Sequence, residues 1–438
     1  MPDRQGKPAA SPHLITKGLA AFGAGALLLH GVRFGLKVFG PARPFRLQNR
    51  RPLATDSQEF LDRLSCLTDS IVYKDSQISI LKNGLEFYPA QLNAIDAAAK
   101  SINLEAYEFL EGDLTREIVR RLAARARQGV RVRLMIDAIG SFGTRRKYFE
   151  PLLSAGGEIA WYHPLTWKEW PYFDHRTHRK LLIVDGEIGF IGGADFADHW
   201  IEVEKGKLPW RDTVFRIKGG VVRSLNATFA ENWVDATGRI LFDGTQFPPD
   251  RPAGDKTAMV VTSSAGYSTS RARMLFQTLL ESAQSSIQIT SPYFLPDRSV
   301  HHALRRAIRE RGVKVQVLTA GRDTDYNSVR RLSEMLSVSL VKAGVEFYEY
   351  RSSMIHAKLL TIDGNWTVVG STNFDHRSFS LNDEVNLAVF DQEITRRIED
   401  DFRQDLQQSE RMTPKRLRST SLGGRLLTEA SWVFRDEQ

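Results

Sequence analysis

Residues 178–185 read His-Arg-Lys-Leu-Leu-Ile-Val-Asp, and residues 356–363 read His-Ala-Lys-Leu-Leu-Thr-Ile-Asp. Both stretches have the pattern H-x-K-x-x-x-x-D. In each copy, aliphatic residues that favour β-strands lead into Asp-Gly, a dipeptide typical of hairpin turns. A second apolar run then ends in Gly-Gly-Ala-Asp at 192–195 or Gly-Ser-Thr-Asn at 370–373. Each copy therefore predicts a strand, a tight turn and a returning strand.

The spacing within the motif indicates which side chains lie together. Alternate side chains of a strand share a face, so the histidine and lysine of each copy point the same way and the aspartate points the other way. A neutral imidazole beside an ammonium suits attack on a phosphodiester, because the ammonium neutralises the oxyanions while the imidazole supplies a lone pair or a proton. The aspartates are better placed to orient the strand end than to touch phosphorus. The candidate catalytic residues of the two motifs are His178, Lys180, Asp185, His356, Lys358 and Asp363.

Two copies in matching contexts resemble the phospholipase D superfamily and, within it, the bacterial cardiolipin synthases. The resemblance covers about residues 80–410. It implies an α/β fold with two similar lobes, each a mixed β-sheet flanked by helices. The lobes would be related by a pseudo-two-fold axis and would share one active site.

The resemblance also implies an orienting carboxylate for each histidine. Asp212 lies in Trp-Arg-Asp-Thr at 210–213, and Glu384 lies in Asn-Asp-Glu-Val-Asn at 382–386. In the resembled family, an acidic residue at each of these places hydrogen-bonds the imidazole of a motif histidine. Such a carboxylate fixes the tautomer of the ring and stabilises the imidazolium, as in other catalytic triads.

Phosphate binding is implied for the two motif lysines and for the residues that end each motif, which are Ser371, Asn373 and Asp195. The lysines and Asn373 would hold the non-bridging oxygens, so neither a metal nor another cofactor is expected. Asp195 departs from the family pattern, which usually has Asn there. A carboxylate facing a phosphate is repulsive unless it is protonated or turned away. Gly193 occupies the position in the first motif that corresponds to Ser371, so the first motif has no matching hydroxyl.

The implied mechanism has two steps. One histidine attacks the phosphorus of a phospholipid and forms a phosphohistidine, while the other protonates the departing alcohol. The second histidine then deprotonates the incoming alcohol or water. Family habit favours His178 as the nucleophile and His356 as the acid/base, but the sequence does not decide between them.

The two halves of the chain repeat one pattern at an offset of roughly 180 residues, which fits a duplicated domain. We expect a tail with a membrane segment (1–54), a first lobe (55–244), a linker (245–257) and a second lobe with C-terminal helices (258–438). In the first lobe, residues 55–75 predict a helix followed by a strand, and residues after 88 predict a helix through 99, a strand (101–107), a helix (114–128) and a strand (129–137). In the second lobe the sequence predicts a strand (286–291), a helix (299–311), a strand (312–318) and a helix that ends at 342–344.

The N-terminal region predicts membrane attachment. Residues 18–29 are uncharged and apolar, and aliphatic residues continue to Phe39, interrupted by a basic stripe at 30, 33 and 37. About a dozen uncharged residues fall short of the roughly 20 needed to span a bilayer. A spanning helix (about 14–39), an interfacial anchor and a signal peptide remain alternatives, of which we favour attachment. Basic residues after the segment favour a catalytic body on the cytoplasmic side of a bacterial membrane.

The single cysteine and the other histidines give weaker signals. Cys66 excludes an intrachain disulfide, and we expect it to be a small buried residue near a helix. His175, three residues before the first motif, could approach the phosphate entrance, but we favour a solvated loop histidine. Structural or surface roles are expected for His163, His199, His301, His302 and His376. The aromatic residues before the first motif fit a lipid interface and a plain core equally well; they are Trp161, Tyr162, Trp167, Trp170, Tyr172 and Phe173.

The chain carries a formal net charge of +8 and has a pI near 9.4, which favours an anionic partner such as nucleic acid or an acidic lipid surface. The apolar segment and the resemblance favour lipid. We therefore expect transfer of a phosphatidyl group from phosphatidylglycerol to a lipid alcohol, giving cardiolipin, with no nucleic-acid partner. The alternatives are a phospholipase D that uses water, a nuclease and a non-catalytic membrane scaffold. A monomer would suffice for one shared site, and the oligomeric state stays open.

Overall fold

The computed structural model describes residue 25 and residues 45–48, 53–167, 169, 172–202, 208–242, 244–249, 251–264, 270–322, 324 and 327–418 of the 438-residue chain. Apart from residue 25, these residues belong to one compact unit, Pro44–Ala430. The predicted membrane segment at 14–39 therefore falls outside the described residues, except for the single position 25. Among the described helices, none is long and apolar enough to cross a bilayer.

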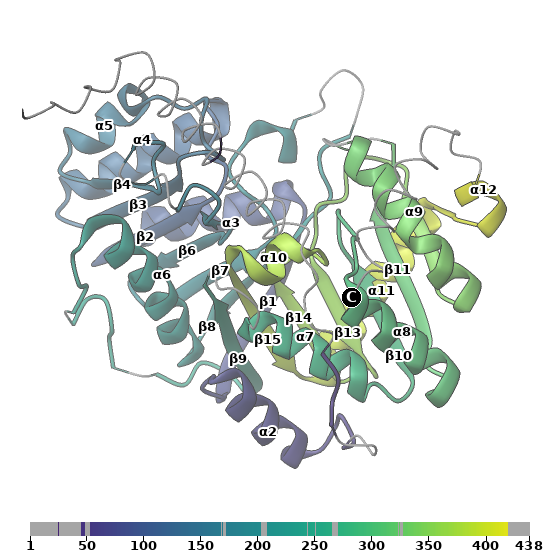
Figure 1. The fold of residues 1–438 in the computed structure, drawn as a ribbon. Helices are drawn as coiled ribbons and strands as arrows, with labels where there is room; N and C mark the ends of the chain where they lie inside the picture. The colour runs from purple at the N-terminus through teal and green to yellow at the C-terminus, as the bar shows by residue number, and fades with distance from the viewer. Residues whose placement is uncertain are drawn as a thin grey trace, which may run out of the picture. The chain divides into compact units, whose positions relative to one another are not determined.

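A mixed β-sheet runs through the whole unit (Figure 1). Its strand order is β16-β12-β11-β10-β13-β14-β15-β9-β1-β8-β7-β6-β2-β3-β4, and β5 pairs separately with β15. The first half of the chain supplies β1 (Tyr73–Lys82), β2 (Ser101–Ala106), β3 (Arg131–Asp137), β4 (Glu158–Tyr162), β5 (Arg176–Thr177), β6 (Leu181–Val184), β7 (Ile188–Gly192) and β8 (Thr213–Lys218). The second half supplies β9 (Lys256–Ser263), β10 (Ser286–Thr290), β11 (Lys314–Ala320), β12 (Glu346–Tyr350), β13 (Leu359–Ile362), β14 (Trp366–Gly370), β15 (Asn382–Phe390) and β16 (Ser409–Arg411).

The centre of the sheet is the antiparallel pair β1–β9. Moving outward from β1, the strands follow the order β8, β7, β6, β2, β3, β4; moving outward from β9, they follow β15, β14, β13, β10, β11, β12. The two series run in matching order, so each strand of the first series corresponds to a strand of the second. In both series the inner pairs are antiparallel and the outer two are parallel. The expected pair of similar lobes related by a pseudo-two-fold axis is confirmed.

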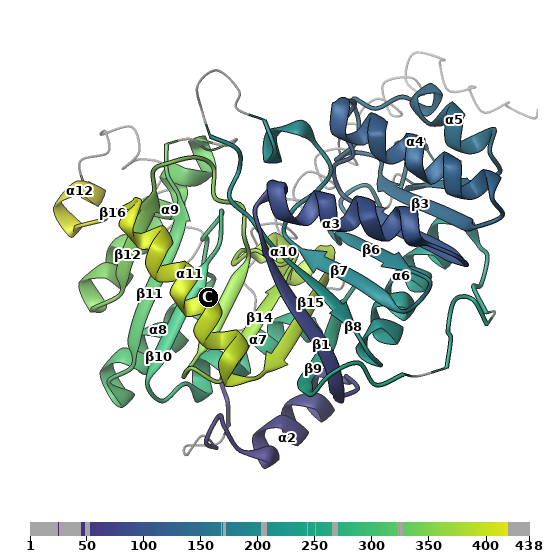
Figure 2. The same ribbon diagram turned by 180° about the vertical axis from the view of Figure 1, so that it is seen from behind.

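Helices cover both faces of the sheet, and equivalent helices of the two lobes lie on opposite faces. In Figure 1, α6 faces the viewer together with α7 and α8, whereas Figure 2 brings α3, α4 and α11 to the front. The helices of the first half are α2 (Gln58–Thr68), α3 (Gly84–Ala97), α4 (Asp113–Arg127), η1 (Arg146–Phe149), α5 (Glu150–Leu153), η3 (Asp198–Trp200) and α6 (Val221–Thr237). Those of the second half are α7 (Arg271–Ser282), α8 (Arg298–Arg311), α9 (Asn327–Ala343), α10 (His376–Ser380), α11 (Gln392–Gln407) and α12 (Pro414–Arg418).

The buried apolar residues fall into lobe cores and a shared central core. One cluster lies under α3 and α4, another under α2, α7 and α8. A third joins the two lobes: Phe229 and Trp233 of α6 belong to the same cluster as Ile394 and Ile398 of α11, with β1 packed beside them. Because burial of apolar area is the main favourable term in folding, this shared cluster binds the lobes to each other.

Most predicted elements are confirmed within about two residues. There are two exceptions. Strand β1 runs on to Lys82, beyond the predicted stretch 55–75. Helix α3 begins at Gly84, where the letters Leu-Glu-Phe-Tyr led us to expect the helix only later. Phe87, Tyr88, Gln91 and Ile95 are buried at helical spacing, so tertiary packing decides the conformation. Between α6 and β9, the described residues of 238–255 contain no helix or strand. Cys66 was expected to be buried but is exposed on α2.

Both predicted hairpins are confirmed, and their Asp-Gly turns explain the motif aspartates. Asp185 and Gly186 have φ of 55° and 67°, and Asp363 and Gly364 have φ of 54° and 68°, as a type I′ turn requires. The Asp185 carboxylate accepts hydrogen bonds from the backbone N–H groups of residues 99–101 at 2.7–3.2 Å. The Asp363 carboxylate does the same for residues 284–286 at 2.7–3.0 Å. Each aspartate thus ties its hairpin to the start of the neighbouring strand.

We predict that Asp363→Ala lowers the free energy of unfolding by about 1–3 kcal/mol, because three backbone donors lose a charged acceptor. Urea denaturation measures this value. The matched control is Asp255→Ala, whose side chain is 88% exposed and should change stability by less than about 0.5 kcal/mol. Equal midpoints for the two variants would contradict the structural role of Asp363.

Candidate active site

The two motif histidines lie just before β6 and β13, and each is docked by its backbone to the other lobe. The His178 N–H donates to the Asp383 carbonyl at 2.9 Å, beside the short parallel pair of β5 with β15. The His356 N–H donates to the Arg211 carbonyl at 2.8 Å. In both cases the accepting carbonyl belongs to the residue immediately before an orienting carboxylate.

Those carboxylates are exchanged between the lobes. His178 Nδ1 lies 3.0 and 3.1 Å from the two carboxylate oxygens of Glu384. His356 Nδ1 lies 3.2 Å from Asp212 Oδ2. Asp212 and Glu384 therefore occupy the orienting positions that the resemblance implied, and each serves the histidine of the opposite lobe.

Glu384 is fully buried and has further donors. The hydroxyl of Ser371 donates to one of its oxygens, and the amide of Asn382 donates to the other at 3.3 Å. Although burial alone would raise the pKa of Glu384, the contacts with His178 and Ser371 hold that pKa below its usual value. Ser371 was expected to bind phosphate; the structure instead places its hydroxyl on the carboxylate behind His178. We therefore assign Ser371 to the positioning of Glu384.

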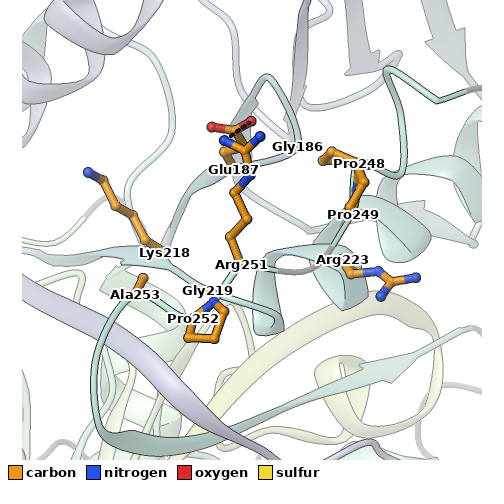
Figure 3. Close-up of a pocket in the computed structure, with 10 residues that line it drawn as sticks. All are labelled: Gly186, Glu187, Lys218, Gly219, Arg223, Pro248, Pro249, Arg251, Pro252 and Ala253. Carbon is orange, nitrogen blue, oxygen red and sulfur yellow. Dashed lines mark ion pairs between the residues drawn. The ribbon is translucent and has the colours of Figure 1, made fainter.

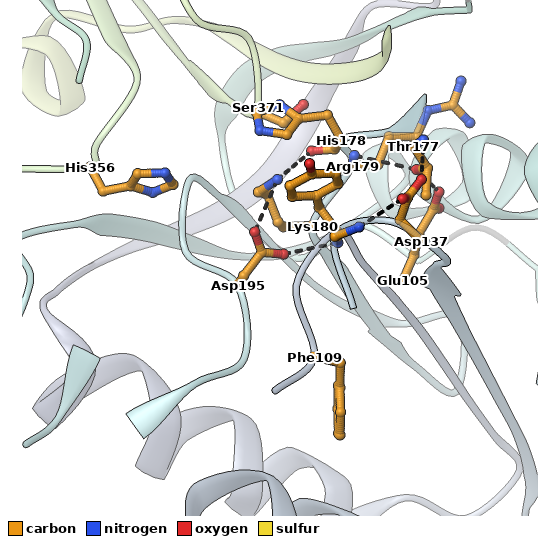
Figure 4. Close-up of polar contacts among 12 residues, drawn as sticks. Glu105, Phe109, Asp137, Thr177, His178, Arg179, Lys180, Asp195, His356 and Ser371 are labelled. Atoms are coloured by element: carbon orange, nitrogen blue, oxygen red, sulfur yellow. Dashed lines mark hydrogen bonds and ion pairs between the residues drawn. The ribbon is translucent and has the colours of Figure 1, made fainter. Parts of the chain in front are cut away.

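Lys180 is held by a second carboxylate (Figure 4). Its Nζ lies 3.2 Å from Asp195 Oδ2 and donates to the His178 carbonyl at 2.8 Å. The other oxygen of Asp195 accepts from the Tyr107 N–H at 2.9 Å. Asp195 was a candidate phosphate ligand, but both of its oxygens face donors from the protein, and a carboxylate would repel phosphate. We therefore assign Asp195 as the counter-ion of Lys180.

In the second motif a neutral residue takes the position of Asp195, and Asp212 of the other lobe is the carboxylate that most favours the charge of Lys358. Lys358 Nζ lies 2.9 Å from each ring nitrogen of His356 and donates to the His356 carbonyl at 2.7 Å. Asn373 stands where Asp195 stands in the first motif, and its buried Oδ1 has no hydrogen-bond partner among the described residues. Burial lowers the pKa of Lys358 to about 7. The two half-sites therefore share one geometry but differ in charge.

The site disfavours the charged form of both imidazoles. Burial is the main cause: it lowers the pKa of His178 despite Glu384, and, together with the neighbouring charge of Lys358, it lowers the pKa of His356 to about 3. The hydrogen-bond network assigns the ring proton of each histidine to Nδ1, where the carboxylate accepts it. Each Nε2 then carries a lone pair.

Asp185 and Asp363, also named as candidate catalytic residues, lie at the turn ends of β6 and β13. Lys180 and Asp185 are five residues apart, which in an extended strand is about 16 Å. Their backbone contacts, described above, lie at that far end of the strand. We therefore assign both aspartates a structural role.

The structure adds residues that the sequence did not single out. The ring of Tyr107 packs edge-on to His178, with 5.3 Å between ring centroids. Thr177, next to the histidine, donates its hydroxyl to Glu105 at 2.5 Å and its N–H to Asp137 at 3.1 Å. Burial raises the pKa of Glu105 to about 7 and that of Asp137 to about 6. The sequence could have indicated Glu105 and Asp137, because both lie near the ends of predicted strands and parallel strands end at a common edge of the sheet.

Aromatic side chains surround the other histidine. The rings of Trp200 and Trp210 lie 5.6 and 5.5 Å from that of His356. His199 stacks against Trp210 at 3.9 Å, and burial lowers its pKa to about 4. His199 thus packs against the two tryptophans that flank His356.

A separate hollow of about 110 Å³ lies away from the histidines, at the turn end of the β6–β7 hairpin (Figure 3). Arg251 approaches Glu187 across it at 4.0 Å. The hollow is lined by Gly186, Glu187, Lys218, Gly219, Arg223, Pro248, Pro249, Arg251, Pro252 and Ala253. It is therefore a feature of the segment that connects the lobes and not part of the paired-histidine site.

The arrangement is suited to a two-step transfer at phosphorus. It offers two imidazoles and two lysines from the two lobes, and the lysine of each motif acts electrostatically on the histidine of the other. Among the described residues, no group of three or more His, Cys, Asp or Glu side chains is placed to hold a metal ion.

Comparison with known proteins agrees with this geometry. A family model described as "Cardiolipin synthase, PLD-like domain" matches residues 92–203 and 276–406. A probable cardiolipin synthase of Bacillus subtilis is 33% identical over 344 residues, covering 77% of this chain and 68% of that protein. A cardiolipin synthase of Alkalihalophilus pseudofirmus is 30% identical over 414 residues, covering 91% of this chain and 81% of that protein.

Solved structures share the fold at lower identity. Phosphatidylserine synthase of Haemophilus influenzae aligns with a TM-score of 0.62 at 15% identity, covering 86% of this chain and 98% of that one. Polyphosphate kinase of Porphyromonas gingivalis aligns with a TM-score of 0.53 at 13% identity, covering 89% of this chain and 57% of that one. At these identities the likeness concerns the fold alone.

We predict that Glu384→Gln lowers the pKa of His178 further, because the carboxylate that favours the imidazolium is lost. A ¹⁵N NMR titration of the labelled protein measures this shift. Asp212→Asn is the matched control, since it removes the partner of His356 and should leave the titration of His178 nearly unchanged. An unchanged His178 titration in Glu384→Gln would contradict the exchange of carboxylates between the lobes.

Proposed function

This chain belongs to the family of cardiolipin synthase, phospholipase D-like domains, and we propose that it is a phosphatidyltransferase that makes cardiolipin from phosphatidylglycerol. The observation that carries the proposal is the pair of motif histidines, each oriented by a carboxylate from the opposite lobe. The relatives named as cardiolipin synthases extend over most of the chain and support the choice of donor and product.

In the proposed first step, His178 is the nucleophile. Its Nε2 lone pair attacks the phosphorus of phosphatidylglycerol, the bond from phosphorus to the glycerol oxygen breaks, and a phosphatidyl-histidine forms. Glu384 supports this role, because it contacts His178 Nδ1 with both oxygens and stabilises the positive charge that the ring acquires.

His356 supplies the proton for the departing glycerol. The ring is neutral in the empty site, but a phosphodiester anion nearby favours the imidazolium, so binding of the donor would draw a proton to Nε2. That proton passes to the leaving oxygen. The ring is then neutral again and ready to act as a base.

In the second step, His356 removes the proton from the hydroxyl of a second phosphatidylglycerol. The hydroxyl oxygen attacks phosphorus, the phosphorus–nitrogen bond breaks and cardiolipin leaves. Lys180, Lys358 and Asn373 would hold the non-bridging oxygens throughout. Lys180 and Lys358 supply the charge, and Asn373 provides a hydrogen bond from its side-chain amide.

We place the enzyme at a bacterial membrane, with the segment at about 14–39 as its attachment and the body on the cytoplasmic side. The body would consist of lobes at 55–244 and 258–438 joined by a linker at 245–257. The partners are then phospholipids and the membrane surface, and one chain carries a complete site.

The direct test supplies purified protein with phosphatidylglycerol in mixed micelles plus a chelator and identifies the products by mass spectrometry. We expect cardiolipin and free glycerol, and we expect His178→Ala to lower the rate by at least about 10³-fold, as for other nucleophile deletions. His302→Ala, at an exposed histidine of α8, is the matched control and should retain activity. Phosphatidic acid as the main product would instead identify a hydrolase.

A second prediction concerns the alkaline limb of the pH profile. Lys358 is charged below its pKa of about 7, so kcat/KM should fall as the pH rises through that value and phosphate binding loses an ammonium. In Lys358→Arg the guanidinium stays charged, so the limb should move to higher pH even if the maximum is lower.

The profile is measured at low phosphatidylglycerol concentration, where the rate reports kcat/KM, in the wild type and in two variants. Lys256→Arg is the control, because that lysine lies on the β9 side of the linker and pairs with Asp391 and Glu393. Superimposable alkaline limbs for wild type and Lys358→Arg would reject Lys358 as the titrating group.

A further inference from the structure

The catalytic edge of the first lobe is formed by strand ends. β2, β3 and β4 are parallel, so Ala106, Asp137 and Tyr162 end at one edge of the sheet. β6 runs antiparallel to β2, which brings Lys180 to the same edge. The loops that follow β3 and β4 therefore start beside the active site.

The loop after β3 is fixed on both sides of an exposed aromatic tip. The Ser141 hydroxyl donates to the Tyr107 carbonyl at 3.0 Å, and the Thr144 hydroxyl donates to the Phe109 carbonyl at 2.5 Å. Phe142, between them, is 78% exposed. The surrounding bonds thus hold an apolar ring in water.

The loop after β4 carries further exposed apolar residues. Trp167 is 83% exposed, Leu165 55% and Tyr172 49%. The ring of Tyr172 stacks on His163 at 5.5 Å and lies 5.9 Å from that of His175, three residues before His178. By contrast, Tyr162 of the same aromatic cluster is buried. The cluster therefore divides into a core part and an exposed part. We call Phe142, Leu165, Trp167 and Tyr172 the apolar rim.

Cations follow the rim directly in the sequence. Three exposed cations begin three residues after Phe142; they are Arg145, Arg146 and Lys147. Arg145 lies 3.8 Å from Glu111, and its side chain is still 85% exposed. Exposed aromatic rings beside a cluster of cations match a surface that is apolar within and anionic at its boundary.

We propose that the apolar rim and the cations at 145–147 form a docking surface for an anionic phospholipid bilayer. The surface lets the catalytic edge lie against the membrane, with Phe142 and Trp167 inserted at the headgroup level and the three cations on lipid phosphates. This inference rests on the proposed function, because the docking surface would bring the paired histidines to their phospholipid substrate. It involves residues remote in sequence from the segment at 14–39.

The test measures depth at single labelled positions in the full chain. The only cysteine, Cys66, is replaced by Ser, and a fluorophore is attached in turn at Phe142→Cys, Trp167→Cys or Phe242→Cys. Phe242 is 90% exposed and follows Arg239, which pairs with Glu158 at the opposite end of β4, so it is a matched control. Spin-labelled lipid in phosphatidylglycerol vesicles or in phosphatidylcholine vesicles quenches any label that enters the bilayer.

We expect labels at 142 and 167 to be quenched at least twofold more than the label at 242 in phosphatidylglycerol vesicles, and less in phosphatidylcholine. The N-terminal segment is identical in all three proteins and so cannot create a difference between positions. Equal quenching at the three positions would overturn the docking surface. Equal quenching at 142 and 167 in both kinds of vesicle would overturn the part assigned to the cations.

A kinetic measurement separates this inference from the proposed function. Phe142→Ser combined with Trp167→Ser should lower transfer on phosphatidylglycerol vesicles at least fivefold and leave transfer on monomeric short-chain phosphatidylglycerol unchanged. Loss on both substrates would argue against a docking role. If the wild type forms no cardiolipin, the proposed function fails, but the quenching result still decides whether this edge meets the bilayer.

Discussion

Each catalytic imidazole is held by a carboxylate that the other half of the chain supplies, and the architecture depends on this exchange. Glu384 lies on β15 and Asp212 lies just before β8, so neither histidine is oriented by its own lobe. The exchange works only if the lobes meet in one register, because a slip by one residue turns every side chain of a strand to the opposite face. The lobes are joined by the β1–β9 pair, the short β5–β15 pair and the apolar core shared by α6 and α11.

The pseudo-symmetry is accurate in the backbone and broken in the charges. Lys180 is paired with Asp195, whereas Lys358 contacts its own histidine, and the neutral Asn373 takes the position of Asp195 in the second motif. Gly193 is also explained by packing. A Cβ there would lie 2.8 Å from the His356 carbonyl and 2.9 Å from Asp212, so the Asp212 half-site has no room for a counterpart of Ser371. One half-site uses glutamate with serine, the other aspartate with glycine, and the two histidines are therefore suited to different roles.

The sequence was sufficient for what depends on local pattern. Paired aliphatic runs around Asp-Gly predicted the hairpins, and the repeated order of strands and helices predicted the two lobes. It was insufficient where packing decides. The helical start at Gly84 follows from burial of Phe87 and Tyr88, and the exposure of Cys66 follows from which face of α2 meets the core. The partners of Ser371 and Asp195 depend on contacts between distant residues, which no local spacing encodes.

The connection between α6 and β9 has a consequence for how the site varies. Two separate copies of one lobe would meet at a concentration-dependent equilibrium, and every substitution would appear twice, once on each side of the axis. Joining them in one chain makes the encounter intramolecular, with an effective concentration set by the length of the connection. A residue can then change on one side alone. The covalent link is thus what allows Asp195 to pair with one lysine while the neutral Asn373 takes the matching position beside the other motif.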